Sequence, residues 1–132
     1  MSLKKHIIIL IFVLVIEYLL GMMTNLFVHF PDSASETQLW EFSKRQLPVI
    51  LHILVGLSLL IGSLTLALRS FRQKDNSIKI ATIIGLVSIF LAGFAGSRFV
   101  STQNGNYSFV MSFTFATALL SYIWAIYKTS SS

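Results

Sequence analysis

Long apolar runs dominate the chain and are separated by short polar segments. The four runs extend over residues 7–30, 47–68, 78–100 and 107–127. Each has about the 20 residues that a helix needs to cross a hydrocarbon layer roughly 30 Å thick. A transmembrane β-barrel is expected to show shorter segments in which apolar and polar residues alternate. The pattern therefore predicts four transmembrane helices, because backbone groups in lipid have to be satisfied within each segment.

The polar connections between these runs are short. They cover residues 31–46, 69–77 and 101–106, and connections of this length join antiparallel neighbours. The predicted fold is therefore all-α: an up-down-up-down four-transmembrane-helix bundle that forms one domain over residues 1–132. The first connection holds Trp40 and Phe42 among acidic and polar residues, which is typical of an amphipathic turn lying on a bilayer surface.

The composition supports a membrane protein and excludes several other classes. Hydrophobic residues make up 55% and charged residues 11% of the chain, whereas a soluble chain carries roughly 25% charged residues. The absence of cysteine excludes a disulfide scaffold and a thiol nucleophile. The sequence contains no phosphate-binding loop, zinc-protease motif or nucleophile elbow. No catalytic residue is assigned, and the pattern favours a non-enzymatic protein.

The net charge of +5 is mainly explained by membrane orientation. The positive-inside rule favours the topology that places most bases in the cytoplasm, which here puts both termini there and predicts a multi-pass protein of the cell membrane. The acids Asp32, Glu36 and Glu41 then lie outside, and a nucleic-acid partner is not expected. The seven of ten bases on the cytoplasmic side are Lys4, Lys5, Arg69, Arg72, Lys74, Lys79 and Lys128.

Glu17 lies near the middle of the first apolar run. Together with the length of the run, it indicates a retained span rather than a cleaved signal peptide. An ionised carboxylate at that depth costs roughly 2.5–3.5 kcal/mol, so its helix face should point into the bundle. Two alternatives follow: a protonated Glu17 hydrogen-bonded to a neighbouring helix, for instance to Ser63 or Thr65, or an intramembrane proton or polar ligand site.

A second group of polar residues is expected in the outer half of the bundle. His52 lies one to two turns from the outer end of the second run, and counting along antiparallel helices brings other residues to a similar depth. His29 and Arg98 have an alternative role as headgroup anchors at helix ends. The predicted binding residues are His52, His29, Asn25, Arg98, Met111 and Ser112.

This group suits two kinds of ligand. A neutral imidazole of His52 can ligate haem iron, with His29 or Met111 as the candidate second ligand and Arg98 placed to pair with a propionate. His52 could instead donate a hydrogen bond to a quinone head. A metal role for His52 is expected only for haem iron, because the histidines have no other metal-binding spacing. Haem or a quinone-like molecule is thus the predicted ligand.

Small residues repeat along the last two runs and indicate close helix packing. Gly85, Ala92 and Gly96 share one face of the third run. The fourth run has a corresponding stripe of Thr114, Ala118, Ser121 and Ala125. Such faces also fit a structural or accessory subunit of a larger membrane complex, or association with a second copy. Proton-coupled transport through Glu17 is a third alternative.

Two segments of the chain resemble a group of known membrane proteins: Glu17 to Val28 (EYLLGMMTNLFV) and Leu51 to Gly56 (LHILVG). They resemble the first helix and the start of the second helix of small four-helix bacterial integral membrane proteins of uncharacterised function. The layout of most of the chain is similar to theirs, and the specific motifs cover about two helices. The resemblance implies a four-helix fold and a cell-membrane location.

His52 carries a looser similarity to one four-helix half of the haem A synthase family. That family binds haem through histidines near the outer ends of helices, and the resemblance implies a haem-ligating role for His52 alone. The chain departs from the family at Val49, where an acid usually accompanies the histidine, and at Ser112 and Phe113, where a second ligand would be expected.

Overall fold

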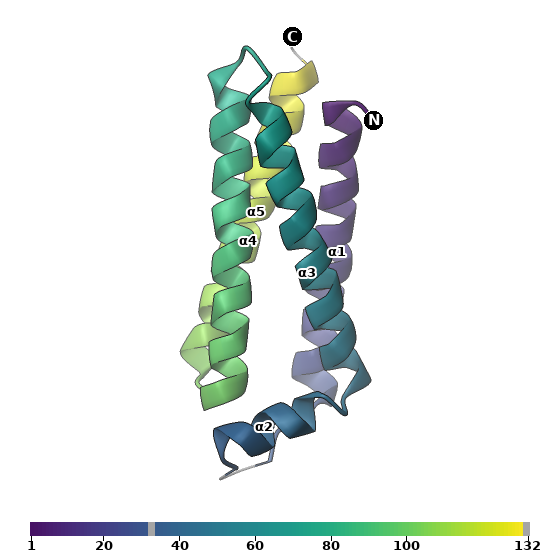
Figure 1. Ribbon diagram of the computed structural model, residues 1–132. Coiled ribbons are helices and arrows are strands. Elements are labelled where there is room, and N and C mark those ends of the chain that lie inside the picture. The colour runs from purple at the N-terminus through teal and green to yellow at the C-terminus, as the bar shows by residue number, and fades with distance from the viewer. Residues whose placement is uncertain (32–33, 131–132) are drawn as a thin grey trace.

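The computed structural model describes residues 1–31 and 34–130 and confirms the all-α architecture. Four of its helices are long and apolar enough to span a membrane: α1 (Leu3–Phe27), α3 (Leu47–Ser70), α4 (Asn76–Thr102) and α5 (Gly105–Ser130). They run alternately up and down, so the start of α1 and the last turns of α5 lie at the same end of the bundle (Figure 1). We call this the terminal end.

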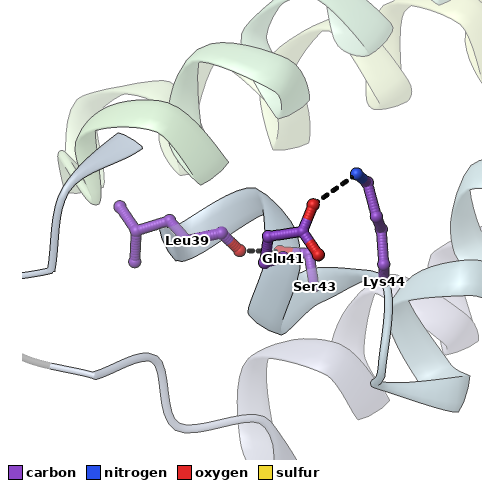
Figure 2. A network of polar contacts seen from close by, with 4 residues as sticks. All are labelled: Leu39, Glu41, Ser43 and Lys44. Atoms are coloured by element: carbon purple, nitrogen blue, oxygen red, sulfur yellow. Dashed lines mark hydrogen bonds and ion pairs between the residues drawn. The ribbon is translucent and has the colours of Figure 1, made fainter. Parts of the chain in front are cut away.

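A short helix, α2 (Glu36–Ser43), lies across the opposite end, which we call the α2 end (Figure 1). Ser35 and Gln38 cap its first turn reciprocally, with the Ser35 backbone N–H donating to Gln38 Oε1 at 2.8 Å. Figure 2 shows its last turn, where the Ser43 hydroxyl donates to the Leu39 carbonyl at 2.8 Å and Lys44 pairs with Glu41 at 2.7 Å. The sequence predicted an amphipathic turn on the bilayer surface in this connection; the structure has a short helix there, and its position on a bilayer stays a prediction.

Aromatic contacts fasten α2 to the end of α4. The Trp40 indole N–H donates to Ser101 Oγ at 3.2 Å. The Phe30 ring lies between those of Phe42 and Phe99, with centroid separations of 5.6 and 6.2 Å. The connection from α1 to α3 is therefore held against α4, on the other side of the bundle.

The core lies between the four long helices, and their outward faces are apolar. Large apolar side chains such as Phe12, Ile61 and Phe109 are about two thirds exposed or more, at 66%, 68% and 72%. Such a surface is unsuited to water and suits contact with lipid acyl chains. The principal buried apolar side chains are Ile7, Leu10, Leu14, Leu59, Leu66, Ala81, Ala118, Tyr122 and Ala125.

The helix boundaries correct the sequence predictions at two places. α1 covers Leu3–Phe27 instead of residues 7–30. It begins at Leu3 because the Ser2 hydroxyl caps its first turn by accepting the Lys5 backbone N–H at 3.2 Å. The turn between α4 and α5 shrinks from residues 101–106 to two residues, and Gln103 ends α4 with a left-handed φ of 53°. Asp32 lies outside the described residues.

Candidate functional site

Glu17 of α1 and His52 of α3 meet inside the bundle. The distance from Glu17 Oε1 to His52 Nδ1 is 3.1 Å, and the two side chains are 14% and 28% exposed. Between Lys5 and Phe27, α1 carries no other acid or base apart from His6 near its start, and α3 carries none other before Arg69. The pair is thus an isolated polar contact between two apolar helices.

This contact corrects the predicted hydrogen bonding of Glu17. Ser63 donates instead to the Leu60 carbonyl and Thr65 to the Ile61 carbonyl, both at 2.9 Å and both within α3. In the structure Glu17 lies beside Gly56 of α3. Gly56 and Ser63 are seven residues apart, which is about 10 Å along a helix. Both hydroxyls are therefore too far along α3 for Glu17.

The site has hydrogen-bonding capacity that the protein leaves unused. Glu17 Oε2, His52 Nδ1 and Thr24 Oγ1 are enclosed without a hydrogen-bond partner among the described residues. The ring of His52 lies within ion-pair distance of Glu17, but its N–H direction is not that of an aligned hydrogen bond. Thr24 follows Glu17 on the same face of α1. Three enclosed polar atoms without partners thus occur around one helix contact.

The hydroxyl of Thr24 behaves unlike other threonine hydroxyls in the spans. Thr65, Thr114 and Thr117 each donate to the carbonyl four residues earlier, which is the usual way for a threonine to satisfy its hydroxyl within a helix. Thr24 makes no such bond. Its hydroxyl is therefore enclosed without a hydrogen-bond partner in the described part of the chain, unlike those of the other three threonines.

The other predicted binding residues have different surroundings. Asn25, Arg98 and Ser112 are exposed, and Ser112 donates to the Ser108 carbonyl at 3.1 Å. His29 is exposed and lies beyond the end of α1. Met111 packs on α4, where its sulfur would lie 3.1 Å from a Cβ added at Gly96. The structure brings Glu17 to His52, and among the described contacts none of these five residues is hydrogen-bonded to that pair.

His6 was not predicted from the sequence to be a buried or functional residue. His6 is buried at the terminal end, with its Nδ1 3.2 Å from Arg69 Nη1, and Arg69 also donates to the Met1 carbonyl. The position of His6 directly after two lysines gave no indication of burial, because the predicted span began after it. These contacts fasten the first turn of α1 to the last turn of α3.

The arrangement of the imidazole defines what the pair can offer a ligand. Nδ1 faces Glu17, whereas Nε2 is not among the enclosed atoms. In a neutral imidazole one ring nitrogen donates and the other accepts. When protonated Glu17 donates a hydrogen bond to Nδ1, the ring proton is on Nε2, and Nε2 is a donor. When ionised Glu17 accepts a hydrogen bond from the Nδ1–H group, Nε2 becomes an acceptor. One proton therefore decides which hydrogen bond the site makes.

No cluster of three or more metal-binding side chains occurs in the described part of the chain. Comparisons of the chain with protein-family models, with curated proteins and with solved structures found no match. The resemblances seen in the sequence therefore remain predictions.

Proposed function

We propose that this protein is a non-enzymatic integral membrane protein that binds the polar head of a quinone-type ligand at the contact between α1 and α3. The observation that supports this proposal is the Glu17–His52 pair, which lies among apolar helices with polar atoms left unpartnered. Ionisable side chains within membrane spans are costly and rare, and they commonly mark functional sites. Polar atoms enclosed without partners are costly as well, and a ligand that satisfies them recovers that cost.

A ring oxygen of a quinone matches the chemistry of this pair. The carbonyl of the oxidised ring accepts a hydrogen bond from Nε2, and the hydroxyl of the reduced ring donates one to it. The Thr24 hydroxyl, on the same face as Glu17, is a second polar group for the head. The apolar tail of such a ligand is soluble in the bilayer beside the exposed apolar faces of the helices. The part of the ligand inside the protein is thus small.

Haem is less compatible with the same contact. The His52 ring packs directly on α1, with its Cε1 only 3.3 Å from a Cβ added at Gly21. The two predicted second ligands are elsewhere, since Met111 packs at Gly96 and His29 lies past the end of α1. Haem is nevertheless an outcome that the experiment below distinguishes.

A proton pathway through one copy of the chain is also disfavoured. Leu14 precedes Glu17 by one turn, and Leu59 follows Gly56 by one turn toward the terminal end; both side chains are 2% exposed. Leu10 extends this apolar layer against Gly62. The layer separates the pair from the polar groups nearer the terminal end, so the pair is suited to binding rather than to a relay across the bundle.

The charge distribution supports an orientation for this site. Lys4, Lys5, Arg72 and Lys74 are exposed at or near the terminal end of the helices, and basic residues of this kind favour the cytoplasmic side. We therefore propose the cell membrane as the location, with both termini in the cytoplasm. The α2 end then faces outward, and the pair lies closer to that side.

The proposal is tested by equilibrium binding of a short-chain benzoquinone to the protein in lipid nanodiscs. We expect saturable binding that weakens about tenfold in H52Q and E17Q, the loss expected for about 1.4 kcal/mol of hydrogen bonding. Ser58→Ala is the matched control, because Ser58 is exposed on α3 and bonds only to the Val55 carbonyl. Unsaturable binding, or equal affinity in all four proteins, would overturn the proposal. A haem absorption band in the purified protein that H52Q removes would favour haem instead.

A further inference from the structure

Each member of the Glu17–His52 pair lies against a glycine of the facing helix. A Cβ added at Gly56 of α3 would lie 2.8 Å from Glu17 Oε1, and a Cβ added at Gly21 of α1 would lie 3.3 Å from His52 Cε1. Each glycine follows the ionisable residue of its own helix by four positions. Residues four apart lie on one face of a helix, so antiparallel pairing places each glycine opposite the other helix's polar side chain.

These two contacts restrain the atoms of the pair directly. The atom that a side chain at position 56 would meet is Oε1, the same carboxylate oxygen that lies 3.1 Å from His52 Nδ1. The carboxylate is the flexible end of its side chain, so a side chain at position 56 would displace it rather than the backbone and would change its contact with Nδ1. At Gly21 the contact is looser, so a shift of a few tenths of an ångström in the ring relieves it. Alanine should therefore disturb the pair more at position 56 than at position 21.

We infer that Gly21 and Gly56 are positioning residues that hold Glu17 and His52 in contact and thereby set the direction and hydrogen-bonding role of Nε2. Because glycine has no side chain, positions 21 and 56 leave free the space that the imidazole and the carboxylate occupy. The geometric part of this inference stands on the contacts alone, and its consequence for ligand binding rests on the proposed function.

The chain offers two matched controls for a glycine-to-alanine change. At Gly62, also on α3, a Cβ would lie 2.8 Å from Leu10 Cδ2, which is the same distance as at Gly56 but to the end of a flexible apolar side chain. At Gly93 of α4 a Cβ would meet no atom within 4 Å. Gly62→Ala thus reports the cost of crowding α1 against α3, and Gly93→Ala reports the change in helix propensity alone.

The test is the ¹⁵N nuclear magnetic resonance signature of the His52 imidazole, recorded in bilayers for the full chain. We expect G56A to change the tautomer or protonation signature, G21A to change it less, and G62A and G93A to leave it unchanged. In an E17A background the shortened side chain removes the clash, so adding G56A should have no further effect. An unchanged signature in G56A, or an equal change in G62A, would overturn the inference.

Benzoquinone affinity, measured on the same variants, separates the inference from the proposed function. If G56A loses about tenfold in affinity and its ¹⁵N signature also changes, the result supports both the positioning role and the proposed function. A changed signature in a protein whose parent binds no benzoquinone supports the positioning role and overturns the proposed function. Unchanged signature and affinity in G56A overturn the positioning role alone. If G56A does not fold, G21A is used instead, because a small shift relieves its contact and the protein should fold. A ¹⁵N signature that changes in G21A but not in G62A or G93A supports the positioning role, and an unchanged one overturns it.

Discussion

Two helix contacts in this molecule use glycine in the same way and accommodate different side chains. Between α4 and α5, Gly85 lies under the Tyr122 ring, where an added Cβ would overlap Cε1, and Gly96 lies under Met111. Between α1 and α3, Gly56 lies under the Glu17 carboxylate and Gly21 under the His52 imidazole. In the first contact the glycines accommodate a ring and a thioether, and in the second they accommodate ionisable groups.

The difference lies in the chemistry and the accessibility of the accommodated side chains. Tyr122 is 0% exposed and belongs to the core cluster, so Gly85 serves close packing, as small residues commonly do between membrane helices. The Tyr122 hydroxyl is enclosed without a hydrogen-bond partner among the residues that the structure describes, as are atoms of Glu17 and His52, but Glu17 and His52 are an ionisable pair and remain partly accessible. A stripe of small residues therefore indicates packing or a site according to the side chain that faces it.

Gly85→Ala should have the largest effect on stability. The new methyl group overlaps the hydroxyl-bearing edge of a fully buried ring, and overpacking of this kind costs typically about 1–3 kcal/mol. Thermal unfolding in detergent, followed by circular dichroism, should show a lower transition temperature.

Gly93→Ala is the control for this substitution, because no atom lies within 4 Å of its added Cβ. Its transition should match that of the parent or rise slightly. Equal transitions for both variants would show that the α4–α5 contact is not closely packed around Gly85.

Leucine substitutions at Glu17 and His52 should separate stability from binding. His52→Leu leaves an enclosed carboxylate without its base and should cost roughly 1–2 kcal/mol, less than the 3–5 kcal/mol typical of fully buried pairs, because both side chains are partly exposed. The double variant E17L/H52L should recover that stability and still fail to bind benzoquinone. A double variant less stable than H52L would mean that the pair itself stabilises the α1–α3 contact.

Thr82→Val should have a smaller effect, confined to the stability of the fold. The Thr82 hydroxyl of α4 donates to Ser70 Oγ of α3 at 2.8 Å, and both residues are 0% exposed. Losing one buried hydrogen bond costs about 1 kcal/mol, so the unfolding transition should fall modestly while benzoquinone affinity stays unchanged. Loss of affinity would show that the α3–α4 contact influences the site at the α1–α3 contact.

Acidification should have the smallest effect, restricted to α2. The hydrogen bond from Lys44, with its positive charge, lowers the pKa of the Glu41 carboxyl below its ordinary value of 4.5. The contact therefore stabilises α2 above pH 4.5, and this contribution is lost as the pH falls through the lowered value. Amide hydrogen exchange in α2 should accelerate there in the parent and not in Glu41→Gln. Equal acceleration in both would assign the effect to another group.

The spans were predictable because length and hydropathy alone decide which segments cross a bilayer. The partner of Glu17 was not, because counting residues does not fix how far α1 is shifted along α3, and Glu17 lies beside Gly56 rather than Ser63. Counting depth along the helices placed Arg98 and Ser112 near His52, but depth does not specify which way a side chain points, and both are exposed.

The glycine spacing was present in the sequence, four residues after Glu17 and four after His52. It becomes informative only once α1 and α3 are known to be neighbours. The buried stripe of α5 was predicted better: Thr114, Ala118 and Ala125 are all buried, because a repeat of small residues on one face is itself the packing pattern.

Photolabelling with an azido-benzoquinone in liposomes tests most directly that the α1–α3 contact is the binding site. After illumination, mass spectrometry locates the labelled residues. We predict that the label concentrates between Glu17 and Val28 on α1 and between Leu47 and Gly56 on α3, and that excess unlabelled benzoquinone competes it away. Label spread over the exposed faces of all four spans, or concentrated between α4 and α5 and unaffected by competitor, would contradict the account.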